Sequence, residues 1–272
     1  MDNRFTILTE TEEKEIVSRF KNGCSVVPLI KTFHIGPKRL YEILEAAGLP
    51  RRPAHGPRRY SLQEDAFSAI DSPAKAYWLG FLAADGCVSK TKHRNVVSLG
   101  LNPTDSAHVE KFLHFLGSDQ PIEFCNKKIS PYCRVTVSSA KLVADLGRHG
   151  IVPRKSLILT FSGNLDPAFY NHYIRGYFDG DGCIIAKRRK DNDWAHTYFS
   201  IAGTKSFLGR VAEVLSKNTG VSVSMRSYKS IHILEISARK KIEGVMEWLY
   251  VDSDEATRLD RKYERYQKLL SL

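Results

Sequence analysis

The feature that most constrains this chain is a nine-residue segment that occurs twice, as WLGFLAADG at residues 78–86 and as IRGYFDGDG at residues 174–182. Each copy ends in Asp-Gly and is followed by Cys and an aliphatic residue, with Asp85 in the first copy and Asp181 in the second. One Asp-Gly pair is a weak signal, because such pairs are common in turns and at helix ends. Two matching copies predict a duplicated structure in which both aspartates have the same role.

Each copy has the pattern of the last turns of a helix. In the first copy, Tyr77, Trp78, Phe81 and Leu82 place apolar side chains at helical spacing. Gly86 follows at the position where a residue in the left-handed conformation would end the helix. Each copy also has two small residues spaced so that two helix backbones can pack closely. These pairs are Gly80 with Ala84 and Gly176 with Gly180.

Two such helices, packed about a pseudo-two-fold axis, would bring Asp85 and Asp181 together. Both carboxylates would then lie beside free carbonyl groups at the negative ends of two helix dipoles. Two carboxylates held close repel each other unless a cation lies between them, and hard oxygen ligands suit Mg²⁺. We therefore predict a Mg²⁺ site held by Asp85 and Asp181 with the last helix carbonyls, those of Ala84 and Gly180. The alternative is that the aspartates only cap their helices.

The two copies resemble, position by position, the motif of the LAGLIDADG homing endonucleases in their single-chain form with two motifs. Asp85 and Asp181 stand at the eighth place of the motif, which is the position of the metal-binding acid in that family. The sixth place, which is also Asp in the family's name, is Ala83 in the first copy and Asp179 in the second. This departure leaves the metal-binding position unchanged. The resemblance covers roughly residues 72–272, and it implies that the strands form curved sheets along a DNA duplex.

The resemblance also implies an activity: site-specific, double-strand DNA endonuclease of the intron-homing type, dependent on Mg²⁺, for which Mn²⁺ can substitute. Asp85 and Asp181 would each hold metal at one scissile phosphate, one on each strand. Lys155, in GIVPRKS, stands where the family often has a basic residue that polarises water or phosphate. Lys262, in LDRKYER, would be its counterpart. The alternative is that both lysines lie on the surface and contact backbone phosphate.

The duplication extends beyond the motifs. β-rich runs at residues 96–101, 134–137, 198–202 and 231–236 lie between predicted helices. We therefore predict an α+β fold with a pseudo-two-fold duplicated αββαββα body, its first repeat at residues 62–165 and its second at residues 166–272.

Residues 1–49 are expected to form a small all-α domain. Ser25 and Pro37 have the residue types that begin a second and a third short helix after the first. The segment KTFHIGPKRLYEILEAAGL resembles a helix-turn-helix of the resolvase type, which would place Lys38, Arg39 and Tyr41 in a DNA major groove. The alternative is a three-helix interaction module.

A basic linker at residues 50–61 separates the two parts. Its prolines and glycine oppose regular structure, and Arg51, Arg52, Arg58 and Arg59 appear with no acid among them. An extended arginine-rich arm fits a narrow minor groove, whose negative potential attracts guanidinium groups. A solvated tether is the alternative.

The net charge predicts a polyanionic partner. A formal charge of +11 and a pI near 9.4 favour double-stranded DNA with a long target site, the alternative being a merely basic soluble protein. Basic residues follow both motifs and recur later, where they would bind phosphates or bases unless they form a solvated charge run. They are Lys90, Lys92 and Arg94; Lys187, Arg188 and Arg189; and Arg226 and Lys229.

Other classes of protein find little support in the sequence. The five cysteines contain no CxxC pair and are expected to be reduced thiols. The polar start and the lack of a long apolar run predict a cytoplasmic protein that is neither secreted nor membrane-bound, in a bacterial or phage-infected cell. There is no phosphate-binding GK[ST] loop, HExxH or GxSxG. We expect a monomer.

The main alternative function is a catalytically inactive LAGLIDADG/helix-turn-helix protein that binds DNA as a transcription regulator. A helix-turn-helix joined to such a body would suit that role. A protein that only binds DNA has no need for both Asp85 and Asp181, so the acid pair favours the endonuclease.

Overall fold

The computed structural model describes residues 8–49, 58–91, 94–126, 129–188 and 195–272. These residues form two compact units, one ending at Arg59 and the other beginning at Tyr60. Each unit has its own hydrophobic core. No helix in the described ranges is both long and apolar enough to span a membrane.

The first unit contains three helices, α1 (Glu10–Lys21), α2 (Val26–Thr32) and α3 (Pro37–Ala46). Thr9 caps α1 in a capping box with Glu12, Ser25 is the N-cap of α2, and Pro37 begins α3. The core contains Ile16 and Leu40 with the other buried apolar side chains of the three helices. The three predicted helices are therefore present, and the helix-turn-helix function stays a prediction.

The first half of the second unit folds as a helix, two strands, a helix, two strands and a helix. The helices are α4 (Pro73–Ala84), α5 (Ser106–Phe115) and α6 (Ala140–Arg148), and the strands are β1 (Gly86–Lys90), β2 (Asn95–Leu101), β3 (Glu123–Cys125) and β4 (Tyr132–Ser138). A short 3₁₀ turn, η1 (Pro103–Asp105), precedes α5, and η2 (Lys155–Leu157) follows α6.

The second half repeats this order. Its helices are α7 (Tyr170–Asp181), α8 (Lys205–Thr219) and α9 (Arg239–Tyr250), and its strands are β5 (Gly182–Arg188), β6 (Ala195–Gly203), β7 (Ser224–Tyr228) and β8 (Ile231–Ile236). The turns η3 (Pro167–Phe169) and η4 (Glu255–Thr257) flank these elements, and an additional helix, α10 (Asp260–Leu270), ends the chain. The predicted duplicated αββαββα body is confirmed, and α10 is an addition to it.

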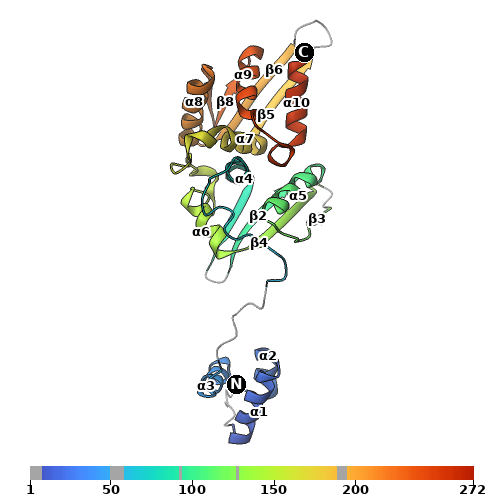
Figure 1. The fold of residues 1–272 in the computed structure, drawn as a ribbon, viewed down its shortest axis with the longest axis vertical. Helices are drawn as coiled ribbons and strands as arrows, with labels where there is room; N and C mark the ends of the chain where they lie inside the picture. The colour runs from blue at the N-terminus through green and yellow to red at the C-terminus, as the bar shows by residue number, and fades with distance from the viewer. Residues whose placement is uncertain (1–7, 50–57, 92–93, 127–128, 189–194) are drawn as a thin grey trace. The chain divides into compact units, whose positions relative to one another are not determined.

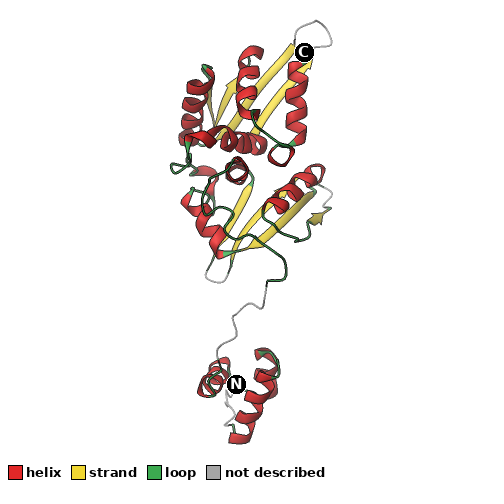
Figure 2. Cartoon of the chain, in the orientation of Figure 1, coloured by secondary structure: helices red, strands yellow, loops and turns green. Residues whose placement is uncertain are grey.

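Each half has one antiparallel four-stranded sheet. The strand orders are β1-β2-β4-β3 and β5-β6-β8-β7, so the two sheets have the same topology. In Figure 1 the helices of each half cover one face of its sheet, and Figure 2 shows helices and strands segregated in this way in both halves. Strand β4 explains the packing: Cys133, Val135 and Val137 are buried, while Arg134 and Thr136 on the opposite face are only partly buried. The face of β4 opposite the core therefore carries polar side chains.

Candidate functional site

Helices α4 and α7 pack together along the predicted stripe of small residues. A Cβ atom added to Gly80 would lie 1.9 Å from the carbonyl oxygen of Tyr173, and one added to Gly176 would lie 2.0 Å from that of Tyr77. The two helices are so close that only glycine fits at either crossing position. The predicted close approach of the two motif helices is confirmed.

The expected left-handed helix end at Gly86 is wrong. Asp85 is the C-cap of α4 with ordinary helical angles (φ −89°, ψ −11°), and Gly86 goes directly into β1. Glycine is needed there because an added Cβ would lie 2.5 Å from the carbonyl oxygen of Leu82. Gly182 has the same role after α7, where a Cβ would lie 2.2 Å from Phe178 Cδ2. Both glycines allow the chain to pass from helix to strand against the preceding turn.

The two motif aspartates lie at this helix seam. A Cβ added to Gly180 would lie 2.4 Å from the Cβ of Ala84 and 3.2 Å from Asp85 Oδ2. The carboxylate of Asp85 on α4 therefore lies beside Gly180 on α7. Asp181 ends α7 and is close enough to Asp85 to raise its pKa by charge repulsion.

Lys155 and Lys262 each donate a hydrogen bond to a backbone carbonyl of the motif. Lys155 is 7% exposed, and its Nζ donates to the oxygen of Ala84 at 2.8 Å. Lys262 is 2% exposed, and its Nζ donates to Phe178 at 2.5 Å and to Gly180 at 3.2 Å. Both lysines are buried beside the motif, so the alternative that they are surface residues is wrong.

The acids and lysines perturb one another's pKa values. Burial, followed by the charge of Asp181, raises the pKa of Asp85 to about 6, while Lys262 and Lys155 oppose the rise. Desolvation also raises the pKa of Asp181, and Lys155 is the strongest opposing charge. Burial lowers the pKa of Lys155 and brings that of Lys262 to about 8. Perturbed acids and bases in one cluster are typical of a functional site.

These contacts divide the cluster into two related sites. Asp181 lies with Ala84 and Lys155 around a pocket of about 250 Å³, which Tyr177 and Gly203 also line. Asp85 lies beside Gly180, whose carbonyl accepts from Lys262. Each site thus combines an acid from one motif, a backbone carbonyl from the other motif and one buried lysine.

The residues at each site fit a hard divalent cation. Among the described residues no three His, Cys, Asp or Glu side chains form a metal-binding group, so the available donors are one carboxylate and backbone carbonyls at each site. Such oxygen donors match Mg²⁺, which keeps several waters and takes one or two carboxylates. The raised pKa of Asp85 is consistent with this fit, because a cation between the acids would relieve their repulsion.

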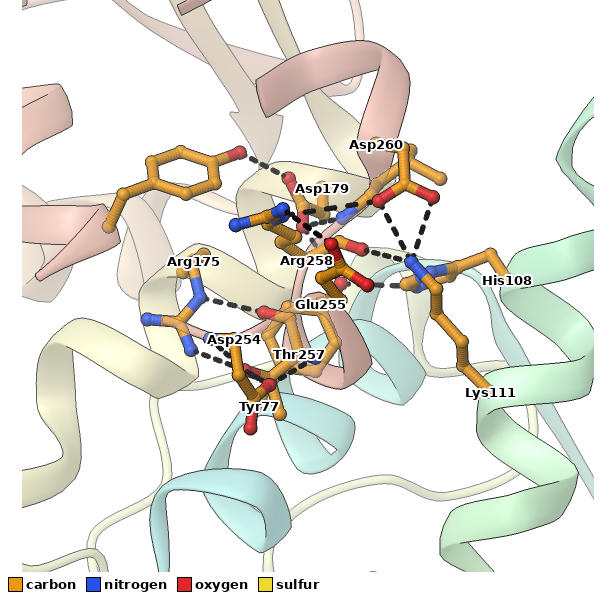
Figure 3. A network of polar contacts seen from close by, with 12 residues as sticks. Tyr77, His108, Lys111, Arg175, Asp179, Asp254, Glu255, Thr257, Arg258 and Asp260 are labelled. Carbon is orange, nitrogen blue, oxygen red and sulfur yellow. Dashed lines mark hydrogen bonds and ion pairs between the residues drawn. The ribbon is translucent and has the colours of Figure 1, made fainter. Parts of the chain in front are cut away.

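Asp179, at the sixth motif place, is fully buried and is the centre of a second network of hydrogen bonds, which Figure 3 shows among neighbouring polar contacts. Its carboxylate accepts hydrogen bonds from Tyr77 Oη at 2.8 Å, Tyr250 Oη at 2.8 Å and the backbone N–H of Leu259 at 2.7 Å. Burial raises the pKa of Asp179, and Lys262 is the main opposing charge. Asp179, whose counterpart in the first motif is Ala83, therefore links α4, α7, α9 and the segment before α10.

Arg175 and His108 extend this network. Arg175, with no exposed surface, donates to Thr257 and Leu249 carbonyls at 2.9 and 2.8 Å and lies over the Tyr77 ring. Since Tyr77 gives its only proton to Asp179, His108 Nε2 must donate to the Tyr77 oxygen, at 3.1 Å. Burial lowers the pKa of His108 to about 3, so its ring is neutral.

The sequence pattern identified the acids, but it missed the residues of this network. The available signal was Asp179 itself, because an acid on an otherwise apolar helix stripe requires partners. Tyr250 and Leu259 come from other elements, so spacing within the motif could not indicate them.

The predicted DNA-binding residues have varied settings in the structure. Lys38 and Arg39 are exposed on α3, where Arg39 pairs with Glu13 at 2.6 Å. Tyr41 is half-buried and packs on the core of the first unit, and its place in a DNA major groove stays a prediction. The following are exposed: Arg58, Arg59, Lys90, Arg94, Lys187, Lys229 and Arg226, which pairs with Glu235. Arg51, Arg52, Lys92 and Arg189 lie outside the described residues, and Arg188 is described only as part of β5.

These features define the class: a duplicated α+β protein with two helix-end acids at the seam between its halves. A comparison with solved structures identifies proteins of similar fold. The chain is similar to the LAGLIDADG meganuclease I-AabMI bound to uncleaved DNA and to the LAGLIDADG homing endonuclease I-GzeII in complex with its DNA target. Each comparison has 12% identity and a TM-score of 0.51 and covers 74% of this chain and 89% of the other. No protein-family model and no curated protein sequence matches significantly. The second unit therefore has the LAGLIDADG fold.

Proposed function

We propose that this protein is a metal-dependent DNA endonuclease that cuts both strands of a specific duplex. The observation that carries the proposal is the pair of sites at the α4–α7 seam, each with an acid, an opposing carbonyl and a buried lysine. The formal charge of +11 and the polar outer face of β4 support a DNA partner. The DNA complexes of I-AabMI and I-GzeII support it through their shared fold.

In this proposal, Asp85 with the Gly180 carbonyl and Asp181 with the Ala84 carbonyl would each hold Mg²⁺, for which Mn²⁺ can substitute. The bound ions would supply the activated water and the charge stabilisation that phosphodiester hydrolysis needs. Lys155 and Lys262 keep the helix-end carbonyls oriented through their hydrogen bonds. Their positive charges would also stabilise negative charge on phosphate oxygens at the seam.

The proposal includes a role for the first unit and a monomeric state. Both sites come from one chain, so cleavage of two strands needs no second copy. The three-helix unit, with Lys38 and Arg39 exposed on α3, would bind DNA as a helix-turn-helix. Homing of an intron would then be the biological consequence of cutting one long target.

The test is cleavage of a library of long duplexes with and without Mg²⁺, followed by sequencing of the new ends. We expect Mg²⁺-dependent cuts at one sequence, and none with Asp85→Asn/Asp181→Asn. Asp65→Asn is the matched control, because it removes the same charge from an exposed residue. Sequence-specific binding without cleavage, unaffected by the double substitution, would refute the endonuclease and support the transcription regulator.

A further inference from the structure

The two sites differ at the fourth motif place, where the first copy has Phe81 and the second has Tyr177. Phe81 is fully buried and packs on Trp78 and His108, with ring centroids 5.7 and 4.5 Å apart. Tyr177 is 3% exposed, packs on Phe207 and carries a hydroxyl that the first site lacks. The hydroxyl therefore distinguishes the two sites.

A compensating difference in the sheets leaves room for this hydroxyl. Gly86 pairs with Leu99 and Gly182 pairs with Ile201, so Leu101 in β2 corresponds to Gly203 in β6. A Cβ added to Gly203 would lie 2.9 Å from Tyr177 Oη. The second half therefore has a larger aromatic residue with a smaller strand residue, and the first half has the reverse.

The hydroxyl of Tyr177 points to the Asp181 site. It donates to the carbonyl oxygen of Ala202 at 3.1 Å, and Tyr177, Ala202 and Asp181 line the same pocket. The same hydroxyl lies near the Asp181 carboxylate. A hydroxyl has one proton and both neighbours are acceptors, so the Tyr177 hydroxyl can donate to Ala202, as it does here, or turn to donate to the Asp181 carboxylate and orient it.

We propose that Tyr177 is a positioning residue that makes the two metal sites inequivalent, so that the Asp181 site binds its divalent ion more tightly and the strand served by Asp181 is cut first. This inference rests on the proposed endonuclease function for its second part only. Ion binding can be measured without DNA. Groups that orient metal ligands typically change metal affinity by about 10-fold or more when they are removed.

The first experiment is titration of the full-length protein with Mn²⁺, followed by electron paramagnetic resonance. We expect two binding sites of unequal affinity, the tighter one lost in Asp181→Asn. Tyr177→Phe should weaken the tighter site about 10-fold and leave the other unchanged. In Asp181→Asn/Tyr177→Phe, Mn²⁺ binding should equal that of Asp181→Asn alone, because Tyr177 acts through Asp181.

Tyr173→Phe is the matched control. Tyr173 lies one turn earlier on α7, has no exposed surface, and its hydroxyl lies near Ser162 and does not line the Asp181 pocket. The same loss of a buried hydroxyl should leave both Mn²⁺ affinities unchanged. Equal weakening of both sites by Tyr177→Phe, or no weakening of either, would refute the positioning role.

The second experiment uses the duplex recovered from the cleavage screen, labelled on one strand or the other. The wild-type protein should nick one strand first, and Tyr177→Phe should slow that strand about 10-fold without slowing the other. Equal rates on the two strands for both proteins would overturn the strand order. A wild-type protein that binds Mn²⁺ unequally but cuts no duplex would instead contradict the proposed endonuclease.

Discussion

The hydroxyl of Tyr77 on α4 donates a 2.8 Å hydrogen bond to the carboxylate of Asp179 on α7, and Asp179 has no exposed surface. This bond crosses from the first half of the LAGLIDADG body to the second. The same carboxylate also accepts from Tyr250 and Leu259, so one acid fixes the helix pair against α9 and the segment before α10. The network therefore supports the helix seam that carries Asp85 and Asp181.

Removing the carboxylate should destabilise the second unit strongly. Asp179→Ala leaves three buried donors without an acceptor, so we expect the free energy of unfolding to fall by about 3 kcal/mol or more. Tyr77→Phe removes one of the three donors to Asp179 and the acceptor of His108, and should cost less, about 1–2 kcal/mol. Urea unfolding monitored by circular dichroism checks both values. Equal stabilities of Asp179→Ala and wild type would contradict the structural role of the network.

The close helix crossing predicts a second set of stabilities. In Gly176→Ala the new methyl group would lie 2.0 Å from a backbone oxygen of Tyr77, so the two helices must separate. We expect a loss of about 3 kcal/mol in the free energy of unfolding. Gly209→Ala is the control, because that helix position has no atom within 4 Å of an added Cβ. It should stabilise the protein by about 0.5–1 kcal/mol, since alanine favours helix more than glycine does.

The buried lysines should affect cleavage more than DNA binding. Lys155→Met and Lys262→Met keep most of the side-chain volume but remove the hydrogen bonds to the Ala84 and Gly180 carbonyls. We expect cleavage rates to fall about 100-fold, as when one preorganised donor is lost, with little change in the dissociation constant for DNA. Lys187→Met, at an exposed position on β5, should do the opposite. Single-turnover cleavage and gel-shift titration separate the two effects.

The raised pKa of Asp85 predicts how stability depends on pH without metal. Its pKa is about 6 in the folded protein against an ordinary value of 3.8. Between these values the folded state holds a proton that the unfolded state has released, so stability falls as pH rises through this window and then levels off. At neutral pH in a chelator, Asp85→Asn should therefore be more stable than wild type, by about 2 kcal/mol after allowance for partial solvent exposure.

That stability difference should shrink as the pH falls from about 6 toward 3.8 and should vanish below that value, because the carboxyl is then protonated in both states. Added Mg²⁺ should stabilise the wild type by binding the folded state, and Asp85→Asn/Asp181→Asn should not respond. Thermal unfolding across pH, with and without Mg²⁺, measures all of these effects. A double substitution that responds to Mg²⁺ as the wild type does would place the ion elsewhere.

The sequence predicted the seam more completely than the site. Duplicated glycines indicated the close helix pair, because their spacing reports a local and repeated packing constraint. The sequence predicts a left-handed helix cap at Gly86, but the structure shows that glycine is needed there because a Cβ would collide with Leu82. A sequence pattern alone cannot distinguish these two reasons for a glycine. Lys155 and Lys262 came from the family resemblance. Tyr177 was not identified as a site residue because its relation to Gly203 appears only when α7 meets β6.

The separate core of the first unit makes its contribution to DNA binding testable by deletion. The first unit packs around Ile16 and Leu40, whereas the body packs around residues such as Trp78 and Phe178. A protein beginning at Tyr60 should therefore retain the circular dichroism and cooperative unfolding of the body.

Loss of the exposed cations Lys38, Arg39, Arg58 and Arg59, with the rest of the basic arm, removes side chains that could neutralise phosphates. DNA affinity should therefore fall, and the plot of log binding constant against log salt should become shallower by about one for each phosphate that is no longer neutralised. Fluorescence anisotropy at several salt concentrations measures that slope. A body that binds with the full-length slope would show that the first unit does not neutralise phosphate, and would favour the alternative of a protein-interaction module.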